Sequence, residues 1–144
     1  MLSCGIDILE IEDFDRSLRL GGGRLLRRIF TDRELALCGE RTSKLAEHFA
    51  VKEAVSKALG TGLRGISARD VEILPYRRQQ LGAHLHGAAD AKSRELGLYV
   101  WAISVSRCKN TVVAVVVATS SDAKSESDHE KSADHCVHEI AGRD

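Results

Sequence analysis

The chain begins with a two-residue alternation of apolar and polar side chains. The apolar positions are Leu2, Cys4, Ile6 and Ile8. This pattern is typical of a β-strand with one buried face. We therefore expect the side chain of Asp7 to point away from that face, either into solvent or into a site. Strand interiors disfavour an acid, and Gly5 leaves room beside it.

Residues 10–30 change to a helical periodicity. Ile11, Phe14 and Leu18 recur at the spacing of an amphipathic helix. Three consecutive glycines at 21–23 interrupt it, and a second short amphipathic run follows. The pattern predicts two short helices separated by a glycine break.

Two helix-start signals come next. Thr31 and Glu34 form a capping box, which predicts a helix that extends to Cys38. Ser43 is expected to cap the longest helix of the chain, which we expect to end at Leu59 before a glycine stop.

This longest helix carries Glu53 and Lys57 one turn apart. They project from the same sector as Ala46, Phe49 and Ala50. An isolated Glu–Lys pair at this spacing usually supports a surface helix by roughly 0.2–0.5 kcal/mol. Here the small and aromatic neighbours leave a functional role open.

A glycine-flanked turn of sequence GTGLRG follows the helix at 60–65. We expect its backbone amides and Arg64 to lie near Lys57, where they would suit a phosphate group. Glycines are also required by tight turns as such, so this signal is weak when taken alone.

The second half of the chain predicts mostly strands. We expect strands over 70–74 and 81–85, a helix over 88–96, and a hairpin around Lys109 and Asn110. The apolar run TVVAVVVAT predicts a second hairpin strand that is buried on both faces. This order of elements predicts an α+β domain in which an antiparallel sheet packs on the long central helix.

Composition supports one globular domain. The 144 residues are 43% hydrophobic and 29% charged, which is sufficient to bury a core. No apolar run reaches membrane-spanning length, and acids interrupt the N-terminus where a signal peptide would be apolar, so we expect a cytoplasmic protein. The four cysteines lack the spacing of a zinc knuckle or a disulfide framework.

The net charge of zero conceals an uneven distribution. Residues 119–144 contain seven acids against three bases, a balance of −4, which leaves +4 on the rest of the chain. We predict that residues 1–118 form the domain and that 119–144 form a polar, disordered tail. A mildly basic body suits an anionic ligand or partner.

Arginine is concentrated in the N-terminal helices. Such a run is either a solvated helix face or a dock for an acidic protein, because arginine pairs well with carboxylates. Nucleic-acid binding is disfavoured, since few aromatic residues lie between the basic ones. The candidates for docking are Arg16, Arg19, Arg24, Arg27 and Arg28.

Two motifs in this chain resemble those of a known family. GIDILEIE at 5–12 and FAVKEAVSKALGTGLRG at 49–65 are similar to segments of holo-[acyl-carrier-protein] synthases, the small 4′-phosphopantetheinyl transferases. The resemblance implies transfer of phosphopantetheine from coenzyme A to a serine of an apo acyl carrier protein, in fatty acid or polyketide synthesis. Adenosine 3′,5′-bisphosphate is then released. A homotrimer with active sites at the subunit interfaces is also implied.

The resemblance assigns roles to single residues. It implies that Asp7 and Glu53 ligate Mg²⁺ and that Lys57 contacts the phosphates, so Glu53 and Lys57 are the catalytic candidates. Magnesium prefers hard oxygen ligands, typically one or two carboxylates completed by water and substrate phosphate. The further coenzyme A contacts that it implies are His48, Gly60, Thr61, Gly62 and Arg107.

Three positions depart from the pattern of that family. Asp13 and His48 stand where arginine is common, and Arg107 stands where histidine is common. We expect Arg16 to replace the charge lost at position 13, and Arg107 to grip a phosphate. The alternative to an active transferase is a degenerate homologue that binds carrier protein or coenzyme A without turnover.

Overall fold

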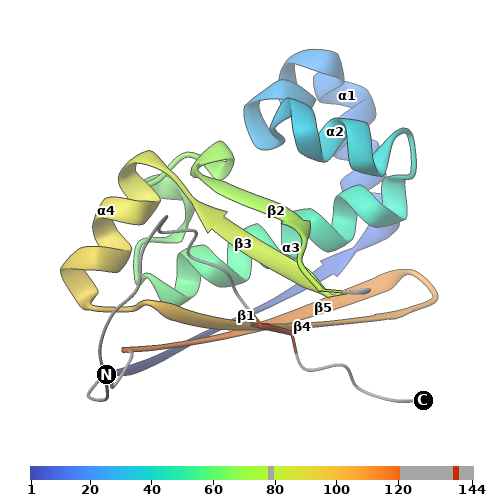
Figure 1. Cartoon of the computed structure of the whole chain (residues 1–144). Coiled ribbons are helices and arrows are strands. Elements are labelled where there is room, and N and C mark those ends of the chain that lie inside the picture. Colours follow the sequence, from blue (N-terminus) through green and yellow to red (C-terminus); the bar gives the residue numbers. More distant parts are fainter. Residues whose placement is uncertain (78–79, 121–137, 140–144) are drawn as a thin grey trace.

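The computed structural model of the protein describes residues 1–77, 80–120 and 138–139. Its larger sheet has the strand order β1-β5-β4-β6 (Figure 1). Strands β1 and β4 are both antiparallel to β5, and β6 lies parallel at the free edge of β4. These strands are β1 (Leu2–Glu10), β4 (Val100–Cys108), β5 (Thr111–Thr119) and β6 (His138–Glu139). Most of the expected tail lies outside the described residues.

A long helix, α3 (Thr42–Ala58), lies between this sheet and a second, two-stranded sheet (Figure 1). Helices α1 and α2 gather at one end of the domain and α4 lies at the other. The remaining elements are α1 (Ile11–Ile29), α2 (Asp32–Cys38), η1 (Gly62–Arg64), η2 (Ala68–Asp70), β2 (Val71–Pro75), β3 (Leu81–Leu85) and α4 (Gly87–Leu96). The predicted α+β arrangement around a central helix is therefore confirmed.

Helix α3 is buried on nearly every side because sheets cover it from two directions. Ala46, Ala50 and Ala54 have no exposed surface, and Val51 and Val55 are equally buried. The alanines allow the backbone of the helix to approach the strands closely. A helix buried all round needs no polar face, which is why its apolar residues do not form a single stripe.

The start of α3 differs from the prediction. Arg41 is the N-cap, with no side-chain hydrogen bond, and Ser43 lies inside the first turn. The amides of Lys44 and Leu45 both donate to the carbonyl of Arg41. The backbone thus begins the helix two residues before the residue with the best capping propensity.

The buried face of β1 is the opposite of the predicted one. Gly5 is buried against α3, whereas Leu2, Ile6 and Ile8 are exposed by 73%, 54% and 66%. A Cβ atom on residue 5 would lie 1.9 Å from the carbonyl oxygen of Ala54. The helix therefore packs on the face that contains glycine, because only that face lets it come close enough.

The prediction that β5 is buried on both faces is also wrong. Val112, Ala114 and Val116 face α3 and are buried, but Val115 and Val117 are each 37% exposed. No described helix covers this second face of the sheet (Figure 1). Together with the apolar side chains of β1, it forms what we call the outer apolar face. Its residues are Leu2, Ile6, Ile8, Val100, Val115 and Val117.

The predicted capping box, hairpin turn and glycine break are confirmed. Thr31 and Glu34 make both hydrogen bonds of a capping box at the start of α2. The β4–β5 hairpin turns at Lys109 and Asn110, and Lys109 adopts a positive φ of 50°. The glycine break in α1 is a kink at Gly22. Its φ is 57°, a value that residues other than glycine rarely adopt.

Candidate functional site

Asp7 lies on the inner face of β1, where it meets the C-terminal half of α3. The Lys57 ammonium lies 2.8 Å from the Asp7 carboxylate and donates a second hydrogen bond to the Ile6 carbonyl at 2.9 Å. The side chain of Asp7 is 14% exposed, while that of Lys57 is 47% exposed. The Asp7 carboxylate is therefore largely enclosed, whereas Lys57 is open to solvent.

Glu53 belongs to the same cluster, one turn before Lys57 on α3. Burial raises the pKa of Glu53, and the negative charge of Asp7 raises it further, while Lys57 offsets part of this effect. Two carboxylates that repel each other in a partly buried site are a suitable place for a divalent cation. Asp7 and Glu53, predicted from separate motifs, are thus brought together.

The donor set fits magnesium better than a transition metal. Within the described parts of the chain, no group of three or more His, Cys, Asp or Glu residues could hold a metal by itself. A site with two protein carboxylates leaves the other positions to water and phosphate oxygens, which is the coordination that Mg²⁺ prefers. Asp7 and Glu53 are the residues that would hold it.

The glycine turn after α3 ends the helix with positive φ values of 74° at Gly60 and 56° at Gly62. The Gly60 amide donates to the carbonyl of Lys57, and the Thr61 amide donates to the carbonyl of Ser56. These two amides therefore complete the end of the helix. The turn holds Lys57 in the last turn of α3, close to Asp7.

His48 and Arg107 line a separate cavity of about 360 Å³ between α2, α3, β3 and β4. His48 is buried, and its Nδ1 atom lies 3.6 Å from Cys38 Sγ and 3.9 Å from a Glu34 oxygen. Burial and the charge of Glu34 raise the pKa of the Cys38 thiol to about 11. The ring of His48 is thus held in the interior by its partners, whereas Arg107 remains 44% exposed.

The five arginines proposed for docking are all exposed along α1. Arg16 pairs with Asp13 at 3.2 Å, and Arg19 pairs with Asp15 at 2.7 Å. Arg16 does not simply replace the charge lost at position 13, because Asp13 is its own ion-pair partner. Arg24, Arg27 and Arg28 have no acidic partner in the described part of the chain.

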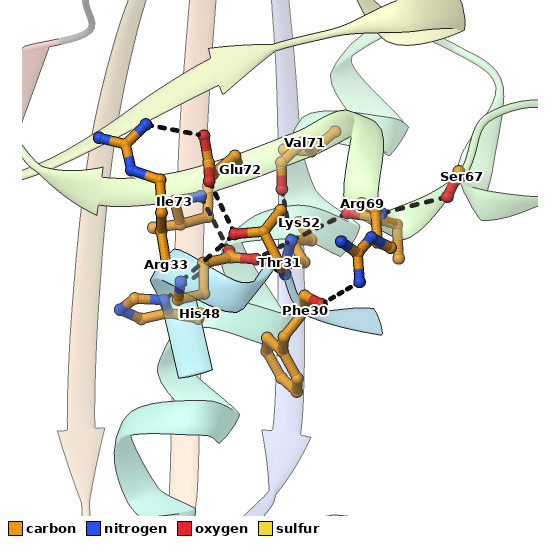
Figure 2. A network of polar contacts seen from close by, with 12 residues as sticks. Phe30, Thr31, Arg33, His48, Lys52, Ser67, Arg69, Val71, Glu72 and Ile73 are labelled. Carbon is orange, nitrogen blue, oxygen red and sulfur yellow. Dashed lines mark hydrogen bonds and ion pairs between the residues drawn. The ribbon is translucent and has the colours of Figure 1, made fainter. Parts of the chain in front are cut away.

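A buried ion pair that the sequence did not reveal supports α3. Lys52 has no exposed side-chain surface, and its ammonium contacts a Glu34 oxygen at 2.9 Å (Figure 2). It also donates to the carbonyls of Ala68 and Val71. Burial lowers the pKa of Lys52, and the charge of Glu34 opposes this shift.

Glu34 is the acid at the centre of this network. Its oxygens accept hydrogen bonds from the backbone amides of Thr31 and Ile73 as well as from Lys52. Burial by itself would raise its pKa, but the contacts of His48, Lys52 and Thr31 together lower it. The network joins α2, α3 and β2, and so fixes the helix that carries Glu53 and Lys57.

Glu72, on β2, is also buried and extends the network. Thr31 donates to it at 2.7 Å, and Arg33 contacts its other oxygen (Figure 2). His86 contacts that same oxygen at 3.2 Å. Burial favours a higher pKa for Glu72, but these three partners lower it overall.

On the same side of the domain, Arg69 donates to the carbonyls of Arg27 and Phe30, and so holds the end of α1.

Comparison with known proteins decides the family. The family model described as the 4′-phosphopantetheinyl transferase superfamily matches residues 3–116. The chain belongs to this superfamily. The match includes the GID motif with Asp7 and the helix with Glu53 and Lys57.

Curated relatives in this superfamily cover most of the chain. It is 42% identical over 124 residues to a holo-[acyl-carrier-protein] synthase of Moorella thermoacetica, covering 84% of this chain and 96% of the relative. It is 35% identical over 124 residues to that of Herpetosiphon aurantiacus, covering 81% and 98%. These matches confirm the predicted family and enzyme class.

Solved structures of the superfamily share the fold. The holo-[acyl-carrier-protein] synthase of Neisseria meningitidis superposes with a TM-score of 0.74 at 32% identity, covering 81% of this chain and 97% of that one. The Helicobacter pylori enzyme, solved in complex with coenzyme A, gives 0.73 at 28% identity, covering 81% and 99%. Among the described helices, none combines the length and the apolar character that crossing a lipid bilayer requires.

Proposed function

We propose that this chain is a holo-[acyl-carrier-protein] synthase that transfers 4′-phosphopantetheine from coenzyme A to a serine of an apo acyl carrier protein. The observation that carries the proposal is the convergence of Asp7, Glu53 and Lys57 from two motifs about fifty residues apart. Its relatives carry the same enzyme name at 35–42% identity, and the related H. pylori structure holds coenzyme A.

Asp7 and Glu53 would hold Mg²⁺ in this scheme. The ion would supply positive charge to the pyrophosphate of coenzyme A. The support within the chain is the setting of Glu53, whose pKa is raised first by burial and then by the nearby charge of Asp7, a repulsion that a bound cation would relieve.

Glu53 and Lys57 would act directly on the transfer step. The carrier serine oxygen bonds to the phosphorus that bears the pantetheine arm, the bond to the adenosine phosphate breaks, and adenosine 3′,5′-bisphosphate leaves. Glu53 would accept the serine proton. Lys57 would stabilise the departing phosphate, since phosphoryl transfer depends mainly on positioning and on neutralising charge.

The rest of coenzyme A would contact the other residues predicted to bind it. These residues are His48, Gly60, Thr61, Gly62 and Arg107. His48 and Arg107 line one cavity, which supports a shared role. Because the ring of His48 is held by Cys38 and Glu34, we assign the direct phosphate contact there to Arg107.

The exposed arginines of α1 would dock the acidic surface of a carrier protein. Arg24, Arg27 and Arg28 follow the kink at Gly22 and form an exposed basic stretch, and Arg16 and Arg19 extend it on the other side. Such complementarity mainly raises the association rate and the selectivity for acidic partners.

We also propose a homotrimer in the cytoplasm. The outer apolar face supports self-association, because an exposed apolar patch on a sheet is typical of a protein interface. The free thiols of Cys4, Cys38 and Cys108 suit a reducing compartment. Sedimentation velocity tests the trimer, and a monomer at micromolar concentration would contradict it.

Mass spectrometry tests the activity directly. Candidate apo carrier proteins would be incubated with the full chain, coenzyme A and Mg²⁺. We expect one phosphopantetheine to be added to at least one of them. If no fatty acid or polyketide carrier gains this mass while coenzyme A still binds, the chain is the degenerate, binding-only homologue.

A further inference from the structure

The cavity lined by His48 and Arg107 contains an unusual arrangement of charge. Arg41, Lys44 and Arg107 are its basic lining residues, and Glu47 is the acid that lines it with them. The carboxylate of Glu47 lies between two of these cations. One oxygen is 3.3 Å from Arg107 Nε, and the other is 2.8 Å from Lys44 Nζ.

The three side chains of this bridge differ in exposure. The side chain of Glu47 is 11% exposed, whereas those of Lys44 and Arg107 are 46% and 44% exposed. The acid is thus enclosed, while solvent and solutes can reach both cations. In an ordinary surface ion pair, by contrast, both charged groups are exposed to water, and the pair contributes little to stability.

Two other polar side chains of the cavity have partners of their own. Arg41 donates to the carbonyls of Leu37 and Cys38 at the end of α2, at 2.6 and 3.0 Å. The His48 ring is directed at Cys38. Lys44 and Arg107 are the two cations of the cavity that share one carboxylate, that of Glu47.

We propose that Glu47 is a specificity-determining residue that occupies a phosphate subsite formed by Lys44 and Arg107. Carboxylates and phosphates bind the same nitrogen donors, so an incoming phosphate monoester must displace the Glu47 carboxylate. The inference rests on the proposed function, since the 3′-phosphate of coenzyme A is the monoester left when its pyrophosphate lies at Lys57. Glu47 then weakens binding of that group and reduces discrimination against 3′-dephospho-coenzyme A.

Calorimetry with adenosine 3′,5′-bisphosphate and adenosine 5′-monophosphate tests the subsite without turnover. We expect Glu47→Gln to bind the bisphosphate roughly three- to tenfold more tightly than the unmodified chain, because a like charge beside the phosphate is removed. The affinity of this variant for the monophosphate should change less than twofold. Lys44→Gln should instead weaken bisphosphate binding.

Glu95→Gln is the matched control. Glu95 pairs with Lys92 at 2.8 Å and i,i+3 spacing on α4, as Glu47 does with Lys44 on α3. The Glu95→Gln substitution should leave the affinities for the bisphosphate and the monophosphate unchanged. Thermal unfolding of each variant confirms that it is folded before binding is measured.

Several results would overturn the inference. One is an unchanged or weaker affinity of Glu47→Gln for the bisphosphate, and another is an equal gain for both nucleotides, which would indicate a general charge effect. If carrier protein is modified normally in those cases, the subsite alone is wrong. If the bisphosphate gain is found but no carrier is modified, the subsite stands and the proposed transferase function fails.

Discussion

Gly5 lies directly against the backbone of Ala54, so closely that a Cβ atom at position 5 would come within 1.9 Å of the Ala54 carbonyl oxygen. This contact sets the distance between β1 and α3. Asp7 follows two residues later on the same face of β1, and Lys57 follows Ala54 by three residues on α3. The Asp7–Lys57 contact therefore depends on the glycine.

Gly5→Ala should separate β1 from α3. The new Cβ atom would overlap backbone atoms of Ala54 and Ala58, which no rotamer change can move, so we expect a loss of about 1–3 kcal/mol in the free energy of unfolding. Turnover should also fall, since Asp7 moves away from Glu53 and Lys57. Urea denaturation and a transfer assay measure the two effects.

Gly23→Ala is the control for this change. Its new Cβ atom would meet only the flexible end of Arg27 at 3.4 Å. We expect unfolding free energy to be unchanged or slightly higher, as alanine is the better helix former. Equal destabilisation by both substitutions would contradict the role assigned to Gly5.

Lys57→Met should lower kcat by about 10²-fold or more, the usual effect of removing a group that stabilises transition-state charge. Lys92→Met, on α4, removes a lysine from another ion pair and should leave kcat unchanged. Steady-state kinetics with a modified carrier as product are sufficient. Near-normal turnover of Lys57→Met would remove Lys57 from the mechanism.

Lys52→Met should destabilise the fold by about 3–5 kcal/mol, because it leaves the buried carboxylate of Glu34 without its cation. The double variant Glu34→Gln with Lys52→Met should recover part of this loss, since no buried charge then remains unpaired. Chemical denaturation of the unmodified chain, the two single variants and the double variant gives the coupling energy between Glu34 and Lys52. Additive losses would mean that the pair has no special energetic role.

Glu72 predicts a specific dependence of stability on pH. Its pKa is lowered in the folded protein, so below the unfolded value of about 4.5 the unfolded chain binds a proton that the folded one does not. The stabilisation by Glu72 is complete above that value and is lost as the pH falls towards the folded pKa. Glu72→Gln lacks this contribution.

Urea unfolding at pH 6.0 and at progressively lower pH checks this expectation. The unfolding free energy of the Glu72→Gln variant should fall less steeply below about pH 4.5 than that of the unmodified chain. Parallel curves would show that Glu72 has the same pKa in both states.

The arginine surface of α1 predicts salt-dependent recognition. Replacing Arg24, Arg27 and Arg28 by alanine should raise KM for an acidic carrier protein several-fold at low salt, and the difference should shrink as ionic strength increases. KM for coenzyme A should not change. Arg94→Ala, which removes an exposed arginine from α4, is the control, and a salt-insensitive KM would rule out this docking mode.

Much of the local structure was predictable because its signals lie within a few residues of one another. The capping box at Thr31 and Glu34, the turn at Lys109 and the strand over 81–85 all agree with expectation. The cap at Ser43 did not, because the preceding loop begins the helix at Arg41. The Lys52–Glu34 pair was missed because both residues have the charges of surface positions.

The resemblance of two motifs to those of a known family indicated Asp7, Glu53 and Lys57 as a group, whereas the residues by themselves left a surface role open for each of them. The amino-acid pattern of β1 could not show which of its two faces is buried, because alternation defines two faces without assigning either to the core. The packing of α3 made that choice, since its backbone fits only against Gly5. The same packing placed Asp7 beside Lys57 and left the apolar side chains of β1 exposed.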